Sequence, residues 1–565
     1  MSTPDENPIP ERLPGLDRRD AWTLGTLLVL FWVSRIAWIE GNLPAAVYWE
    51  EDFRWVALHE ILGGPLRPIF DYQADHYQGG SLVLTLLAAG FTWAFGVGAL
   101  SYKLAAIVCS TTTLTLLYLI GRKAFGHRAA LIVGSAYLAG PPLVAYWGLV
   151  VMGSHGESII FALGLALLFH RLMTREGRTT MTWFGFGVVA GLGLWFCYTA
   201  GLMLGACGLT WLLVVGFPRW KEIAAAISGA ALGLAPWFAY NIQYGFRGLD
   251  RILEMFGYLE PIDSWIEMGT GEKAWNLVSN DWLEGMVAPF LEPAPDGFHA
   301  IVKIGFGIPF VLGLVLFVAR LLAGGVATRR RESLYAVYGL VFLAVFLGMS
   351  FVIPLKEGPH SYRFFLPAAV ILSLPVAESA ARALDTRRGI ATAMIAIFLL
   401  SSGSATLFGA TRAVARERPL SDDFGYKVWG VLSHRKYERT LDDALAETRV
   451  IPELLPRLIM VRGIAWGVAY RFEQDGKRQP VFHALEVARG DETRAVLGGY
   501  EWTAETRLRA VTTRIIAGEP PPRHLAVMER NRWLLELVET EREKRGIAPP
   551  PRNWTPPTTR APDGA

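Results

Sequence analysis

Ionisable side chains gather in three short polar segments, each directly beside a long apolar block of the sequence. The first segment contains Glu50, Glu51 and Asp52. Three adjacent carboxylates repel one another, so we expect at least one of them to hold its proton more tightly, to pair with Arg54, or to bind a cation. A carboxylate in this setting can also act as a general base toward an attacking hydroxyl group, and Glu51 and Asp52 are the candidates.

Metal ligands are suggested by the same segment together with the second one. Asp75 follows in the first segment, and His155 and Glu157 lie between two later apolar blocks. Carboxylate oxygens and imidazole nitrogens suit a hard divalent cation such as Mg²⁺ or Mn²⁺. The sequence therefore predicts a metal site formed by Glu50, Asp75, His155 and Glu157.

The third segment contains His360 and Arg363 beside another apolar block. A guanidinium group can bind a phosphate through two parallel hydrogen bonds, so Arg363 predicts a phosphate site. Each segment also has a simpler interpretation. An acidic run is often a solvated helix end, a single His is often a hydrogen-bonded interface residue, and an Arg at a membrane surface often only anchors the helix.

The composition indicates what must position these residues. The chain has 565 residues, of which 52% are hydrophobic and 19% charged, and its mean hydropathy is +0.31. Its apolar residues occur in blocks of roughly 18–23, about the length of helix that crosses a bilayer core. The sequence therefore predicts an all-α, polytopic helical membrane protein and excludes a soluble multidomain enzyme, a β-barrel and a disulfide scaffold. A net charge of +3 gives no indication of nucleic-acid binding.

The charge distribution predicts the topology. If the apolar segment 81–97 does not cross the membrane, the predicted cytoplasmic segments hold 18 Lys and Arg in 62 residues, against 7 in 120 for the outer loops. This asymmetry is the positive-inside pattern. We therefore predict about eleven transmembrane helices in the plasma (inner) membrane, with a non-spanning helix in the first outer loop. The predicted spans include residues 22–40, 101–120, 129–146, 301–323 and 390–410.

Four regions follow from this topology. Residues 1–21 form a cytoplasmic N-terminal segment, and residues 22–410 form the transmembrane domain. Residues 411–547 contain no apolar block long enough to cross a membrane, and apolar residues at helical spacing predict a mainly helical soluble domain on the outer side. Residues 548–565 are Pro-rich, which predicts a disordered tail.

The order of elements over about residues 20–410 resembles the GT-C superfamily of integral-membrane glycosyltransferases. An acidic pair follows the first span, and a non-spanning helix ends in Phe95-Gly96. Ser101-Tyr102-Lys103-Leu104-Ala105 then leads into a span that ends near Gly121-Arg122-Lys123-Ala124-Phe125-Gly126, and Tyr362-Arg363-Phe364-Phe365-Leu366-Pro367 follows later. The most similar branch is that of the bacterial relatives of protein O-mannosyltransferases and lipid A aminoarabinose transferases.

The resemblance implies roles for residues that match the family's motifs. Glu51 and Asp52 stand where the family has a catalytic acidic pair, with the order of the two acids swapped. Glu157 stands at the family's second acidic position, and His76 stands in a stretch without the family's prolines. The segment from Tyr362 resembles the family's stretch near the lipid phosphate, so His360, Tyr362, Arg363 and His76 are candidate substrate-binding residues. These departures imply an altered substrate or a member that has lost catalysis.

The resemblance therefore implies an inverting glycosyltransferase that moves a hexosyl or pentosyl group from a polyprenyl-phosphate donor to an acceptor at the outer face of the plasma membrane. The acceptor would be a lipid, a glycan or a protein of the cell envelope. Two alternatives use the same residues differently. One is a transporter or flippase for lipid-linked sugars, although the spans show no paired inverted halves. The other is a catalytically silent scaffold that acts through its C-terminal region.

Overall fold

The computed structural model describes most of the apolar part of the chain and part of the C-terminal region. The described residues are 15–42, 51, 54, 57–58, 61–62, 68–73, 78–96, 99–250, 296–324, 331–352, 365–413, 449, 461, 464–465, 468–469, 472–473, 476–516 and 521–548. The chain divides into two compact units, residues 1–417 and residues 418–565. We call them the membrane unit and the C-terminal unit.

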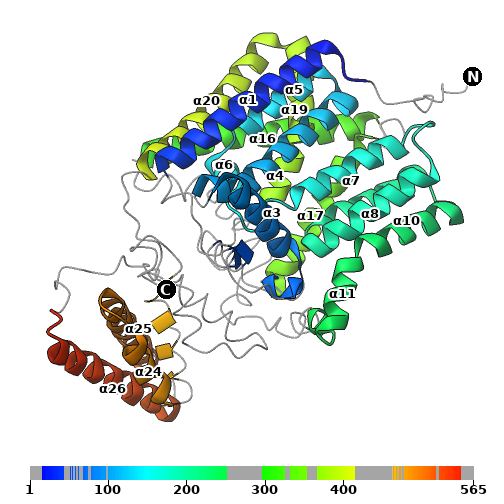
Figure 1. The fold of residues 1–565 in the computed structure, drawn as a ribbon. Helices are drawn as coiled ribbons and strands as arrows, with labels where there is room; N and C mark the ends of the chain where they lie inside the picture. Colours follow the sequence, from blue (N-terminus) through cyan, green and yellow to red (C-terminus); the bar gives the residue numbers. More distant parts are fainter. Residues whose placement is uncertain are drawn as a thin grey trace, which may run out of the picture. The chain divides into compact units, whose positions relative to one another are not determined.

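Helices are the only regular elements among the described residues of the membrane unit (Figure 1). They are α1 (Arg18–Asn42), η2 (Ile69–Tyr72), α3 (Gly80–Phe95), α4 (Ala99–Ile120), η3 (Gly121–Phe125), α5 (His127–Leu138), α6 (Pro142–Trp147), α7 (Ile159–Leu172), α8 (Thr180–Phe196), α9 (Ala200–Val214), α10 (Trp220–Gly233), α11 (Ala235–Gln243), α16 (Asp296–Gly324), α17 (Ser333–Val352), α19 (Leu366–Thr386) and α20 (Arg388–Ala413). The predicted fold class, a polytopic helical membrane protein, is confirmed.

The number of membrane crossings stays a prediction. Within the described ranges, five helices are long and apolar enough to cross a membrane, and a sixth results if α10 and α11, bent by 48°, form one span. Five further apolar helices are shorter, and α3, predicted not to cross, is among them. The predicted span 129–146 is divided between α5 and α6 at Pro141 and Pro142, because a proline lacks the amide that continues a helix.

Helix α4 defines the two ends of the membrane unit. Lys103 lies near its first residue and Arg122 follows its last, so the helical rise separates them by about 28 Å. At the Arg122 end, the carboxylate of Asp20 is fully buried and ties three helices together. Arg122 Nε donates to it over 2.7 Å, and His127 Nδ1 lies 2.8 Å from its second oxygen. We call this the Asp20 end, and the other the Glu51 end.

Small residues allow α8 and α10 to pack backbone against backbone. A Cβ atom added at Gly187 or Gly191 would lie 2.0 or 2.3 Å from a carbonyl oxygen of α10. A Cβ atom at Gly229 or Gly233 would meet α8 in the same way, at 2.1 and 2.4 Å. Close helix contact through small residues is a common device in membranes, where the hydrophobic effect does not drive helices together. This packing fixes the end of α8, which leads into the candidate site.

The C-terminal unit has a small apolar core of its own. Its described helices are α24 (Gln479–Val487), α25 (Asp491–Ile516) and α26 (Pro521–Arg545). In its core, the Tyr500 hydroxyl donates to the Val481 carbonyl over 3.0 Å. Burial raises the pKa of Tyr500 well above its ordinary value, so the hydroxyl keeps the proton that it donates. The predicted boundaries of the soluble domain and of the tail stay predictions.

Candidate functional site

A buried ion pair joins the first acidic segment to α4. Glu51 and Lys103 are each only 1% exposed, and Lys103 Nζ lies 2.5 and 2.7 Å from the two carboxylate oxygens of Glu51. The neighbouring Tyr102 hydroxyl donates to the Glu51 carbonyl over 2.9 Å. Taking two charges out of water is costly, so such a pair persists only with close contact and further hydrogen bonds. The pair therefore fixes the Glu51 carboxylate against the first turns of α4.

The second polar segment meets the same carboxylate. The amide N–H of Val151 donates to Glu51 Oε1 over 2.5 Å, and the next amide, that of Met152, donates to Glu157 Oε1 over 2.8 Å. Consecutive amides thus bind carboxylates that are more than 100 positions apart in the sequence. The structure brings Glu51 and Glu157 together, as expected if the two segments form one site.

Glu157 holds its own loop closed before α7. Besides Met152, the amides of Gly153 and Ser154 donate to its two oxygens over 3.0 and 3.2 Å. Burial raises the pKa of the Glu157 carboxyl, and the hydrogen bonds from the three amides oppose that rise. Both oxygens are engaged by the backbone in this state, so a metal-ligand role would require them to exchange these partners.

His155 lies in the same loop, directly against the turn between α8 and α9. It is 3% exposed, its ring packs edge-on to Tyr198 at 5.7 Å, and its Nδ1 lies 3.9 Å from Cys197 Sγ. The loop is held to this turn by Ser158, whose hydroxyl is 2.9 Å from that of Thr199. The turn between α8 and α9 is therefore a third element of the site.

Two glycines allow the first and second segments to touch through their backbones. A Cβ atom at Gly80 would lie 2.0 Å from the Gly153 carbonyl oxygen, and Gly153 itself has a φ of +72°. The preceding Gly79 donates its amide to the Trp195 carbonyl over 2.7 Å. Only glycine leaves room for these contacts. The space beside these glycines is taken by other parts of the chain, namely Gly153, Trp195 and Phe196.

The start of α19 also reaches this place. A Cβ atom at Gly156, between His155 and Glu157, would lie 3.4 Å from Leu366 Cδ2. Leu366 belongs to the predicted phosphate-binding stretch and follows Arg363 by three residues, at most about 11 Å of chain. The described part of that stretch is thus beside the second segment.

Several predicted site residues lie outside the described residues. These are Glu50, Asp52, Asp75, His76, His360, Tyr362 and Arg363. Their roles stay predictions, and so does the metal. Within the described ranges, no three His, Cys, Asp or Glu side chains are grouped as metal ligands. His155 and Glu157 do not make a divalent site by themselves, so the predicted metal site would also need Glu50 and Asp75.

Lys103 is the residue that the sequence did not single out. Lys103 is part of the motif Ser101-Tyr102-Lys103-Leu104-Ala105, but the motif alone assigns it no role. A signal was present, because a lysine near the start of an otherwise apolar membrane helix is costly to bury unless it has a partner. The sequence did not identify that partner, because Glu51 is 52 positions away.

A comparison with known protein families finds a match within the membrane unit. The model of the dolichyl-phosphate-mannose-protein mannosyltransferase family matches residues 80–240, which run from α3 to α11 and include Lys103, His155 and Glu157. The resemblance to the GT-C superfamily of membrane glycosyltransferases, predicted from the sequence, is confirmed.

Two solved structures are also similar, and both are crystal structures of ArnT from Cupriavidus metallidurans. The apo form has a TM-score of 0.43 at 12% identity and covers 92% of this chain and 88% of its own. The form bound to undecaprenyl phosphate has a TM-score of 0.45 at 13% identity, with 93% and 88% covered. TM-scores below 0.5 do not establish a shared fold. No curated protein matches the chain.

Proposed function

We propose that this protein transfers a sugar from a polyprenyl-phosphate donor to an acceptor hydroxyl at the outer face of the plasma membrane. One observation carries the proposal: Glu51 and Glu157, from two predicted outer loops, accept hydrogen bonds from consecutive amides within the region that matches the mannosyltransferase family. The name of that family includes a dolichyl phosphate, a polyprenyl phosphate, which supports a lipid-linked donor. The sugar would be a hexose or a pentose.

The acidic run supplies the general base in this proposal. The base takes the proton of the acceptor hydroxyl, whose oxygen attacks the anomeric carbon as the bond to the donor phosphate breaks. Direct displacement of this kind inverts the anomeric centre. Lys103 contacts both oxygens of Glu51, and the Val151 amide donates to one of them, so this carboxylate is already engaged by the protein. We therefore assign Glu51 to positioning, and Asp52, the next residue, to the base.

The leaving phosphate requires positive charge as negative charge develops on it. We propose that Arg363 and His360 supply this charge, with His76 and Tyr362 as further substrate contacts. The contact between Gly156 and Leu366 supports this assignment, because it puts the start of α19 beside the second acidic segment. The C-terminal unit would lie on the outer side and bind the acceptor or a partner.

The test compares the cell-surface glycans of a strain that lacks the protein with those of strains carrying variants. Asp52→Asn is expected to leave the glycans as in the strain without the protein, while the amount of protein in the membrane stays normal. Asp385→Asn is the matched control, because Asp385 is 63% exposed at the Asp20 end. Normal glycans with Asp52→Asn would remove the base assignment.

A second measurement separates enzyme from transporter. Purified protein in lipid discs is given polyprenyl-phosphate sugars and candidate acceptors, and mass spectrometry follows the free polyprenyl phosphate and the glycosylated product. Transfer predicts that both rise together in the wild type and that neither rises with Asp52→Asn. Movement of intact lipid-linked sugar across vesicles without any product would contradict the proposal and favour a flippase.

A further inference from the structure

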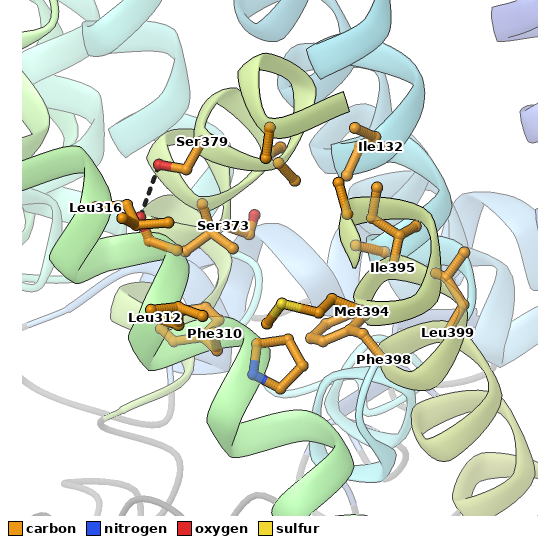
Figure 2. A pocket seen from close by; sticks show the side chains of 18 residues that line it. Ile132, Phe310, Leu312, Leu316, Ser373, Ser379, Met394, Ile395, Phe398 and Leu399 are labelled. Atoms are coloured by element: carbon orange, nitrogen blue, oxygen red, sulfur yellow. Dashed lines mark hydrogen bonds between the residues drawn. The ribbon is translucent and has the colours of Figure 1, made fainter. Parts of the chain in front are cut away.

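An apolar groove lies between four helices of the membrane unit, α5, α16, α19 and α20 (Figure 2). The groove is open along one side, and its empty space, with that open side included, is about 690 Å³. Leu312 and Leu316 of α16, both on its wall, are 39% and 42% exposed. The opposite walls include Ile132, Met394 and Phe398 (Figure 2). An apolar space of this shape suits a hydrocarbon chain that enters sideways from the bilayer.

Arginines stand about one turn beyond the lining at one end of the groove, and two of them belong to α16 and α5. On α16, Arg320 follows Leu316 by four positions, and on α5, Arg128 precedes Ile132 by four. Residues four apart on a helix lie on the same face.

The turn between α19 and α20 adds two more arginines. Arg387 follows the lining residue Ala383 by four positions, and Arg388 precedes Ala391 by three. Only Arg387 separates the two helices, so both arginines stand at the tip of a sharp turn. The groove therefore ends in a basic rim.

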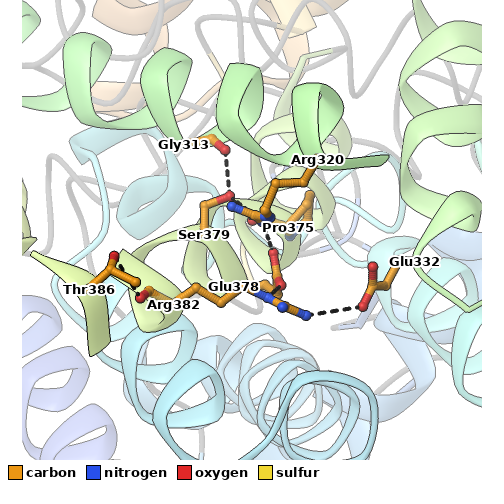
Figure 3. A network of polar contacts seen from close by, with 8 residues as sticks. All are labelled: Gly313, Arg320, Glu332, Pro375, Glu378, Ser379, Arg382 and Thr386. Carbon is orange, nitrogen blue, oxygen red and sulfur yellow. Dashed lines mark hydrogen bonds and ion pairs between the residues drawn. The ribbon is translucent and has the colours of Figure 1, made fainter. Parts of the chain in front are cut away.

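Most of the rim's charges are already compensated. Glu378 is buried and bridges Arg320 and Arg382, and Arg382 also lies 3.5 Å from Glu332 (Figure 3). Arg128 pairs with Asp385.

Arg387 and Arg388 are different. Both are exposed, and no described side chain forms an ion pair or hydrogen bond with either guanidinium group. They leave a local excess of about two positive charges at the end of an apolar groove, which is complementary to a lipid with an anionic phosphate.

The groove is separate from the candidate active site. The contact between Arg128 and Asp385 joins the start of α5 to the end of α19, and α5 starts at the Asp20 end. The Glu51–Lys103 pair lies at the other end of α4. The length of the groove also matches the thickness of one leaflet. The helical rise from Arg320 at the rim to Pro309 in the lining is about 16 Å, close to half of a ~30 Å hydrocarbon core.

We propose that this groove binds an anionic diacyl phospholipid of the leaflet at the Asp20 end. One acyl chain lies along Leu316 and Phe310, and the phosphate contacts Arg387 and Arg388. A chain of about 16 Å suits a fatty acyl group better than a polyprenyl chain, which would extend past the groove. The lipid would hold the ends of α5, α16, α19 and α20 together.

The test uses the full chain in lipid discs made of phosphatidylglycerol and phosphatidylcholine, and native mass spectrometry after release into mild detergent. Phosphatidylglycerol should stay bound to the wild type in preference to phosphatidylcholine. Each arginine beside an anionic headgroup contributes about a five-fold gain in affinity, so the double variant Arg387→Gln/Arg388→Gln should bind about 30-fold more weakly. Ala383→Phe, which fills the groove, should displace the lipid while both arginines remain.

Matched controls make the result specific. Arg18→Gln/Arg19→Gln removes two adjacent, exposed arginines at the same end, away from the groove lining. Ala396→Phe adds the same ring to an exposed face of α20 that does not line the groove. Both controls should retain phosphatidylglycerol. Equal loss in the Arg18/Arg19 variant would overturn the proposal in favour of general surface attraction. Equal retention of phosphatidylcholine, or preferential retention of an added polyprenyl phosphate, would also overturn it.

Discussion

Replacing Lys103 with methionine is expected to destabilise the membrane unit strongly. Methionine keeps the length and apolar stem of lysine and removes the charge that contacts both oxygens of Glu51. Both residues are 1% exposed, so the remaining carboxylate cannot be solvated without opening the structure. Breaking a buried ion pair by removing one partner costs about 3–5 kcal/mol.

The measurement is equilibrium unfolding of the full chain in mixed detergent micelles, followed by circular dichroism. Arg128→Gln is the control, because Arg128 and Asp385 form an ion pair at 62% and 63% exposure. Exposed pairs contribute about 0–1 kcal/mol, so this variant should unfold almost as the wild type does.

A double-mutant cycle then isolates the pair. Glu51→Gln combined with Lys103→Met leaves no unpaired buried charge, so its loss should be smaller than the sum of the two single losses. Contacting residues typically show a coupling of about 0.5–3 kcal/mol. The reasoning is refuted if Lys103→Met loses no more than Arg128→Gln, or if the two single losses simply add.

Three further predictions concern other parts of the chain. Gly80→Ala would put a Cβ atom 2.0 Å from the Gly153 carbonyl oxygen, so it should lower the free energy of unfolding by about 1–3 kcal/mol in the same assay. Gly90→Ala is the control, because a Cβ atom there would have nothing within 4 Å, and it should not destabilise the protein. Equal stabilities of the two variants would contradict the close contact. Thr179→Ala removes the side-chain oxygen that accepts a hydrogen bond from the Thr182 amide at the start of α8, so it should lower the free energy of unfolding by about 1 kcal/mol. Thr179→Ser keeps that oxygen and should keep the stability. A loss of stability in both variants would point to the methyl group instead. Tyr500→Phe removes the hydrogen bond to the Val481 carbonyl, worth about 1 kcal/mol, and should speed amide hydrogen exchange in α25 about five-fold. Unchanged exchange would show that this hydrogen bond does not stabilise α25 against opening.

The fold class was predictable because the thickness of the bilayer sets the length of the apolar block that a spanning helix needs. The described helices α1, α4, α16 and α20 fall where the apolar blocks 22–40, 101–120, 301–323 and 390–410 predict them. The break between α5 and α6 was harder to predict, since the block reads as continuously apolar and only Pro141 and Pro142 indicate it.

The candidate site was only partly predictable. The residue types alone singled out Glu51, His155 and Glu157, because ionisable groups in or beside a membrane are costly to bury and are therefore candidates for function. The partners of these groups depend on which helices pack together. The backbone amides of residues 151–154 could not be identified from the sequence, since every residue except proline has one.

The sequence by itself therefore determined the membrane character, the resemblance to a glycosyltransferase superfamily and the segments proposed for the site, because these follow from local composition and spacing. Only the tertiary structure decided that Glu51 is paired with Lys103, that Glu157 closes its own loop, and that arginines of α5, α16 and the turn between α19 and α20 gather at one end of an apolar groove. Those contacts join residues far apart in the chain, and their energies depend on burial, which exists only after the helices have packed.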